Sequence, residues 1–277
     1  MEEDALQLED SSILRKFIDG YEFTVKCKES FIGQLIQGTT DLTGVMVWPA
    51  TYAMCDFLSW KKNSLSSLSV LELGSGAGLS GLVAARYCKK CAMSDGNEDV
   101  VKLLQENIAR NEGISNVSAH TLCWGVGTDE ELNGQSKFDW VIGSDIIYPS
   151  INEETLKALF TTVEHWLEHS SAARFIISFV MRDAKASLQR LLRIASQSCF
   201  KGSLIPWQTY TVDRPVMGAE IIEFLKVQEF HDAWLANEAI GKEFRQDLWD
   251  EDVVSLDDEW TPPFGEDGDD EEKEEAV

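Results

Sequence analysis

Short apolar runs alternate with amphipathic segments along most of the chain, and this alternation predicts the fold. The apolar runs have the length of strands and cover 70–74, 92–95, 117–124, 138–145 and 174–180. The segments with apolar residues at the three- and four-residue spacing of helices are 79–87, 98–111, 153–169 and 184–198. Two further strands are predicted at 204–212 and 221–227, with no room for a helix between them.

Repeated strand–helix units predict an α/β fold with a doubly wound, mostly parallel sheet of seven strands. The last two strands predict an antiparallel hairpin at the end of that sheet. Ahead of the core, residues 21–34 are expected to form a β-hairpin, and Pro49 can open a helix that runs to Trp60. Ligands of such sheets bind beyond the carboxyl ends of the strands.

The chain is expected to divide into three parts, with no linker that would separate a second folded domain. An N-terminal extension (1–60) packs on the core (61–230), and an acidic tail (231–277) is expected to be largely disordered. The formal net charge is −24, and residues 243–277 contain 16 acidic and 2 basic residues. The rest of the chain is also acidic, which argues against binding to a nucleic-acid backbone.

The lack of a predicted signal peptide or membrane span, together with the scattered cysteines, favours a protein of the cytoplasm or nucleus. The acidic N-terminus is not followed by a long apolar stretch, so no signal peptide is predicted. No window reaches the roughly 18 apolar residues of a membrane span. The six cysteines are scattered, as reduced thiols would be. Cys88 and Cys91 have CxxC spacing, but without a second pair or a histidine pair a zinc site is disfavoured, and a redox dithiol remains as the alternative.

The first candidate for chemistry is the glycine-rich segment 72–78, Glu-Leu-Gly-Ser-Gly-Ala-Gly, between a predicted strand and a predicted helix. Glycines at such a turn let backbone amides approach a ligand closely. They also permit tight helix–strand packing without any ligand. Gly76 to Gly81 matches GxGxxG as well, so a dinucleotide remains possible at this point. Asp95 ends the next strand and can hold the two hydroxyls of a ribose in either case.

Further polar residues follow the third and fourth predicted strands, at the same edge of the sheet. They are Trp124-Gly125 and the segment 143–148, Gly-Ser-Asp-Ile-Ile-Tyr. A dinucleotide site also needs a second half for its nicotinamide, and no segment marks one. An NAD-dependent oxidoreductase is therefore the weaker interpretation.

These motifs, together with Val47-Trp48-Pro49 upstream, resemble methyltransferase family 16 over about residues 15–230. The family contains seven-strand, class I enzymes that use S-adenosylmethionine, including protein-lysine methyltransferases of chaperones, calmodulin and elongation factors. The glycine turn alone indicates only a class I methyltransferase. The aspartate-x-x-tyrosine at Asp145 and Tyr148, joined to Trp48, narrows the resemblance to this family.

The resemblance implies roles for seven residues in binding S-adenosylmethionine. Trp48 would wall the cofactor pocket, Asp95 would accept hydrogen bonds from the ribose hydroxyls, and Trp124 would border the adenine. The others would lie under the methionine part or near the sulfonium: Gly74, Ser75, Gly76 and Ser144. The family members often have alanine at the position of Ser144. Gly96-Asn97 after Asp95 is similar to the calmodulin-modifying members.

Asp145 and Tyr148 are the candidate catalytic residues. A lysine arrives protonated and must be presented to the methyl group as a neutral amine. Asp145 can attract and orient the ammonium, and Tyr148 offers a phenol oxygen and an aromatic face. The alternative is a carboxylate that merely caps a turn beneath a packed tyrosine. Arg182, after the fifth strand, is a further candidate for contact with substrate.

The sequence therefore predicts a monomeric methyltransferase that modifies lysine in a protein. The tail either docks a basic client protein or keeps the enzyme soluble. Alternatives are a small-molecule substrate, another acceptor in a protein (arginine, histidine or the N-terminus), and a non-catalytic protein that retains the pocket. The four histidines have no triad or metal spacing.

Overall fold

The computed structural model describes residues 11–28, 43–125, 132, 136–182 and 186–227. The strands are β1 (Ser11–Ile18), β2 (Tyr21–Lys28), β3 (Ser69–Leu73), β4 (Lys90–Asp95), β5 (Val117–Thr121), β6 (Trp140–Ser144), β7 (Arg174–Phe179), β8 (Phe200–Ile205) and β9 (Glu220–Lys226). The α-helices are α1 (Pro49–Trp60), α2 (Lys62–Leu65), α3 (Leu79–Tyr87), α4 (Glu98–Arg110), α5 (Glu153–Trp166) and α6 (Ala186–Gln197). Short 3₁₀ turns cover 43–45, 207–209 and 216–218.

Seven strands form one sheet in the order β5-β4-β3-β6-β7-β9-β8. The pairs from β5 through β7 are parallel, and β9 pairs antiparallel with both β7 and β8. The predicted α/β class, the seven strands and the final antiparallel hairpin are thus confirmed. The chain runs outward from β3 to β4 and β5 and then returns to β6, so the strand order reverses between β3 and β6. Such a switch point opens a crevice at the carboxyl ends of the strands.

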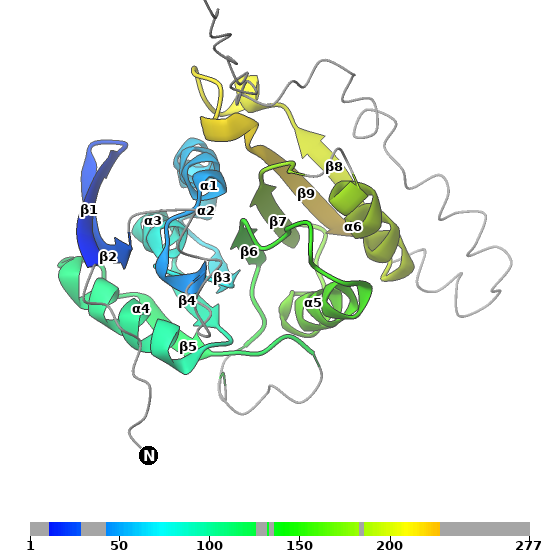
Figure 1. Cartoon of the computed structure of the whole chain (residues 1–277), viewed down its shortest axis with the longest axis horizontal. Coiled ribbons are helices and arrows are strands. Elements are labelled where there is room, and N and C mark those ends of the chain that lie inside the picture. Colours follow the sequence, from blue (N-terminus) through cyan, green and yellow to red (C-terminus); the bar gives the residue numbers. More distant parts are fainter. Residues whose placement is uncertain (1–10, 29–42, 126–131, 133–135, 183–185, 228–277) are drawn as a thin grey trace, which may run out of the picture.

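Two apolar layers cover the sheet because successive strand residues point to opposite faces. Leu71 of β3 and Val141 of β6 pack with the apolar stripes of α5 and α6, whereas Val70 and Ile142 pack with α1 and α3. In Figure 1, α5 and α6 accordingly lie on one side of the sheet and α1, α3 and α4 on the other. These two packed layers hold the strands in position, and the candidate site lies at the ends of those strands.

The N-terminal hairpin is confirmed as an element, but the predicted span of 21–34 is wrong. β1 pairs antiparallel with β2 from Ser11 opposite Lys28 to Ile18 opposite Tyr21, so residues 21–28 form a single strand. The turn is Asp19-Gly20, and both residues have positive φ (49° and 81°), as a two-residue hairpin turn requires. Residues 29–34 lie outside the described part of the chain. In Figure 1 this small sheet stands beside α3 and α4, apart from the main sheet.

The next-to-last strand also differs from prediction, because β8 occupies 200–205 rather than 204–212. Lys201, Gly202 and Ser203 lack an apolar pattern, yet they pair with β9 at the edge of the sheet, where side chains need not be buried. The helix predicted from Pro49 to Trp60 is confirmed as α1. The acidic tail predicted over 231–277 lies outside the described residues. No helix in the described ranges is both long and apolar enough to cross a membrane.

Candidate functional site

The glycine turn joins β3 to α3 at the switch point. Gly74, Gly76 and Gly78 have φ values of 61°, 53° and 89°, which other residues adopt only with strain. A Cβ on Gly76 would lie 3.0 Å from the carbonyl oxygen of Gly44, so space as well as conformation restricts this position to glycine. The turn therefore packs against its neighbours at distances that only glycine allows.

Asp95 ends β4 next to this turn and braces it. Its Oδ2 accepts a hydrogen bond from the backbone N–H of Gly76 (3.1 Å), and its Oδ1 accepts one from the N–H of Asn97 (3.1 Å). Asn97 in turn caps α4, because its side chain accepts from the N–H of Asp99 (2.9 Å). The carboxylate of Asp95 thus lies between the glycine turn and the start of α4, where a ligand that crosses both elements can reach it.

Two tryptophans from separate parts of the sequence, Trp48 and Trp124, line the crevice. Trp48 precedes α1 and is held by a hydrogen bond from its Nε1 to the carbonyl oxygen of Thr43 (3.0 Å). Trp124 follows β5, and a Cβ built on Gly74 would lie 3.7 Å from its ring. Both are partly buried and offer flat apolar walls.

A chain of hydroxyl groups lies beneath the crevice. The hydroxyl of Ser144, at the end of β6, lies 3.3 Å from that of Thr51 and 3.1 Å from that of Ser80. Ser80 also donates to Oε1 of Glu72, which is fully buried in β3. Burial raises the pKa of Glu72 to about 7, although the hydrogen bond from Ser80 opposes that rise.

Asp145 is held by an arginine. Its two carboxylate oxygens accept hydrogen bonds from the two terminal nitrogens of Arg182 at 2.8 and 2.6 Å. The side chain of Asp145 is only 1% exposed, and its backbone has φ 54°, in the left-handed region. The guanidinium of Arg182 also lies 5.5 Å from the centre of the Trp48 ring. Tyr148, in contrast, is 44% exposed.

All nine residues predicted for the site line a single cavity of about 910 Å³. They are Trp48, Gly74, Ser75, Gly76, Asp95, Trp124, Ser144, Asp145 and Tyr148. Among the described lining residues the acids are Asp95, Asp145 and Glu154, against one base, Arg182. This surplus of carboxylates favours ligands that carry positive charge. The volume is that of a pocket for a small molecule of cofactor size.

The lining fits S-adenosylmethionine in three respects. Gly74, Ser75 and Gly76 of the glycine turn line the cavity, Asp95 offers acceptor oxygens for a ribose, and the tryptophans offer apolar walls for a base. Sequence reasoning missed Thr51 and Asn97 and did not foresee that Arg182 pairs with Asp145. The spacing of Asn97 before an acidic first turn of α4 is a helix-cap signal that points to this edge.

Neither a metal nor a reactive dithiol is supported within the described part of the chain. No group of three or more His, Cys, Asp or Glu residues lies close enough there to hold a metal ion. The six cysteines, all in described residues, form no disulfide. A hydrogen bond with Cys88 and burial raise the pKa of Cys91 well above its usual value, which disfavours the redox-dithiol alternative because a reactive cysteine needs a stabilised thiolate.

The seven-strand sheet with its glycine turn at the switch point is the arrangement of class I methyltransferases. The fold of the glycopeptide N-methyltransferase MtfA superposes with a TM-score of 0.51 at 14% identity, covering 64% of this chain and 90% of that one. The model of the lysine methyltransferase family matches residues 31–195, more than half of the chain. The chain therefore belongs to this family, as its motifs indicate.

Several relatives are protein methyltransferases. Protein N-lysine methyltransferase METTL21A of Danio rerio is 37% identical over 123 residues, which is 43% of this chain and 54% of that protein. Protein-lysine N-methyltransferase EFM3 of Chaetomium thermophilum is 33% identical over 149 residues, 51% of this chain and 44% of that one. This chain thus spans about half the length of these two relatives. Histone-arginine methyltransferase METTL23 of Xenopus laevis is 27% identical over 182 residues, covering 64% of this chain and 74% of that protein.

Proposed function

We propose that this protein is an S-adenosylmethionine-dependent methyltransferase that acts on the side-chain amine of lysine in another protein. The observation that carries the proposal is the convergence of the glycine turn, Asp95 and the Asp145–Tyr148 pair on one acidic cavity at the switch point. Membership of the lysine methyltransferase family and the lysine-directed relatives support the same chemistry.

When bound, S-adenosylmethionine supplies an electrophilic methyl group whose bond to sulfur breaks as the acceptor nitrogen attacks. The protein's task is to hold and orient both partners. Gly74, Ser75 and Gly76 would pass beneath the methionine part, Asp95 would accept hydrogen bonds from the ribose, and Ser144 would contribute backbone contacts near the sulfonium. Trp48 and Trp124 would exclude water from the cofactor. No acid–base group is needed for the transfer itself, once the amine is neutral.

The acceptor amine would enter beside Asp145 and Tyr148. A lysine ammonium is drawn by the acidic lining, and desolvation against Tyr148 and Trp48 lowers its pKa and eases loss of the proton. The ion pair between Asp145 and Arg182 restricts how Asp145 can bind the acceptor ammonium. Because both oxygens of Asp145 are engaged, an incoming ammonium must share the carboxylate with Arg182 or displace it.

Arginine is the second candidate acceptor, and one contact favours it. Asp145 already binds a guanidinium end-on, through hydrogen bonds from both terminal nitrogens, and a substrate arginine that replaced Arg182 could bind in the same way. A relative named a histone-arginine methyltransferase agrees with this alternative. We rank it below lysine because the family and the two relatives with the higher identities are lysine-directed.

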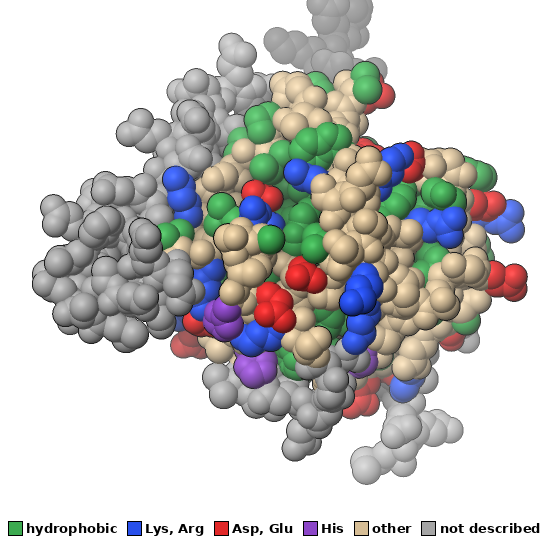
Figure 2. Space-filling view, turned by 180° about the vertical axis from the view of Figure 1, so that it is seen from behind, with side chains coloured by type: hydrophobic (Ala, Val, Ile, Leu, Met, Phe, Trp, Pro, Cys, Tyr) green, Lys and Arg blue, Asp and Glu red, His purple; other side chains and the backbone are tan. Residues whose placement is uncertain are grey.

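We further propose that the protein acts as a monomer in the cytoplasm or nucleus and does not bind nucleic acid. The net charge of −24 opposes contact with a phosphate backbone. On the face shown in Figure 2, basic side chains are interspersed with acidic ones and do not gather into one basic patch. The client is a protein with an accessible lysine. Chaperones, calmodulin and elongation factors are the first clients to test.

The test is transfer of tritiated methyl groups to proteins of a cell extract. Wild-type protein should label a discrete band, and mass spectrometry of that band should locate the methyl group on lysine. Asp145→Ala should abolish the label while still binding S-adenosylhomocysteine in calorimetry. An unchanged label in the variant would refute the role of Asp145. Binding without any label would point to a small-molecule acceptor or a non-catalytic protein.

A further inference from the structure

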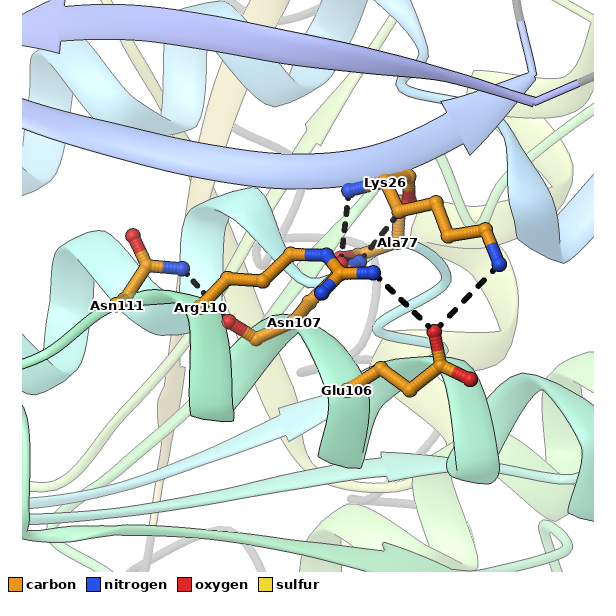
Figure 3. Close-up of polar contacts among 6 residues, drawn as sticks. All are labelled: Lys26, Ala77, Glu106, Asn107, Arg110 and Asn111. Carbon is orange, nitrogen blue, oxygen red and sulfur yellow. Dashed lines mark hydrogen bonds and ion pairs between the residues drawn. The ribbon is translucent and has the colours of Figure 1, made fainter.

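Two asparagines face the N-terminal hairpin four residues apart: Asn107 in the last turns of α4 and Asn111 at its C-cap. Both side chains are buried, with relative exposures of 0% and 7%. Figure 3 shows them between α4 and the strand β2. Buried amides are costly unless their donors and acceptors are satisfied, so their partners reveal what they hold together.

Each asparagine binds both backbone groups of one β2 residue. Asn111 accepts from the N–H of Thr24 (2.9 Å) and donates to its carbonyl oxygen (2.7 Å). Asn107 accepts from the N–H of Lys26 (2.7 Å) and donates to its carbonyl oxygen (3.0 Å). The two amides thus take the place of a neighbouring strand along the edge of β2 that faces away from β1, and they fix the hairpin on α4.

The ion pairs around this contact are weaker determinants. Glu106 lies 3.5 Å from both the Lys26 ammonium and the Arg110 guanidinium, as Figure 3 shows. The Glu106 side chain is about half exposed, and pairs of this kind contribute little in water. Apolar side chains of the hairpin, Phe23 and Val25, are buried in the core, and the two amides are the directional contacts that hold the outer edge of β2 on α4.

The two asparagines differ in one hydrogen bond. The amide nitrogen of Asn111, the C-cap residue of α4, makes its second bond to the carbonyl oxygen of Asn107 in the last turn of the helix (2.7 Å). The amide nitrogen of Asn107 makes its second bond to the carbonyl oxygen of Ala77 (2.8 Å). Ala77 lies in the glycine turn between Gly76 and Gly78, so this bond joins the hairpin to the wall of the cavity.

The connection continues along the chain. Lys28, the last residue of β2, forms a β-bridge with Met46, and Met46 lines the same cavity two residues before Trp48. The hairpin thus contacts the cavity wall from two sides. A shift of β2 would move both the glycine turn and the segment that carries Trp48.

We propose that Asn107 is a positioning residue that couples docking of the β1–β2 hairpin to the conformation of the glycine turn, and so to affinity for the cofactor. The inference rests on the proposed function only in assigning the cavity to S-adenosylmethionine. It predicts reciprocity: a docked hairpin favours cofactor binding, and bound cofactor holds the hairpin more tightly.

The matched pair Asn107→Ala and Asn111→Ala tests this coupling. Each substitution removes three hydrogen bonds, two of them to β2, and only Asn107→Ala removes the bond to Ala77. Calorimetry with S-adenosylhomocysteine should give a dissociation constant about tenfold higher for Asn107→Ala than for Asn111→Ala. The melting temperatures of the two variants should fall by similar amounts. Equal dissociation constants in the two variants would overturn the proposal.

Hydrogen exchange of the wild-type protein gives a second test that does not depend on a variant folding. S-adenosylhomocysteine should slow amide exchange in 21–28 at least severalfold, with little change in the distant strand 200–205. Unchanged exchange in 21–28 despite saturation would also overturn the coupling. Absence of any binding to the wild-type protein is a different result, because it would refute the proposed function itself.

Discussion

Glu72 offers a quantitative test of how the sheet and the cavity floor are built. Its carboxyl group is fully buried near the carboxyl end of β3, Ser80 donates to one oxygen, and Oε2 has no hydrogen-bond partner among the described residues. The ionisable group that acts on the pKa of Glu72 is Asp95, an acid, which raises it further. Replacing Glu72 with glutamine keeps the shape and removes the titration.

The magnitude follows from the pKa. Burial raises the pKa of Glu72 from 4.5 to about 7. One pKa unit corresponds to about 1.4 kcal/mol, so ionised Glu72 costs the folded state about 3 kcal/mol relative to its protonated form. Between these two pH values the folded protein holds a proton that the unfolded chain has lost. The contribution of Glu72 to stability therefore falls as pH rises from about 4.5 to about 7, and it changes little above that range.

Urea unfolding at several pH values measures this effect. The stability of Glu72→Gln minus that of wild type should rise by about 3 kcal/mol between pH 4.5 and pH 8. Glu220, whose pKa burial also raises to about 7, titrates in both proteins and cancels in the difference. Glu112→Gln, at an exposed position, is the control for the exchange of a glutamate for glutamine. A difference for Glu72→Gln that stays constant with pH would refute the reasoning.

Three further predictions concern the cavity. Asp95→Ala removes the acceptor for the Gly76 N–H and should weaken S-adenosylhomocysteine binding in calorimetry by about tenfold or more; unchanged affinity would contradict its role. Arg182→Ala leaves the buried carboxylate of Asp145 without its partner and should lower the free energy of unfolding by about 1–3 kcal/mol, measured in urea; no loss would show that the pair does not form in solution. Cys123 is the exposed cysteine and lines the cavity, so iodoacetamide should label it first and S-adenosylhomocysteine should protect it, as peptide mass mapping would reveal. Equal labelling with and without ligand would place the ligand elsewhere.

Local patterns explain why the sequence predicts so much of this site. Gly74, Asp95 and Ser144 each follow a strongly apolar run, and the carboxyl ends of parallel strands meet at one edge of a sheet. A buried strand and its last residue can both be recognised from a few neighbouring residues in the sequence. That rule accounts for the residues at strand ends, whereas Trp48 and the roles of the cofactor-binding residues were predicted from the resemblance to the methyltransferase family.

The remaining features depend on contacts between distant parts of the chain. Arg182 reaches Asp145 because β6 and β7 are adjacent, and its long side chain has many possible partners that sequence cannot rank. Asn107 reads as one more polar residue of an amphipathic helix, although it binds a strand 81 positions away. Residues 11–18 show no clean alternation, because the exposed face of β1 carries the apolar residues Ile13 and Phe17, and the hairpin was therefore predicted too late in the chain.

The most direct test of the account is calorimetry of S-adenosylhomocysteine with wild type, Gly76→Ala and Gly113→Ala. Both glycines have positive φ (53° and 88°), so alanine at either position should lower the free energy of unfolding by about 1–2 kcal/mol. Only the Cβ at Gly76 meets another backbone atom, whereas that at Gly113 has no atom within 4 Å. We predict that wild type and Gly113→Ala bind one ligand per chain with similar affinity, and that Gly76→Ala binds at least about tenfold more weakly. Wild-type protein that does not bind, or Gly76→Ala that binds equally well, would contradict the assignment of this cavity.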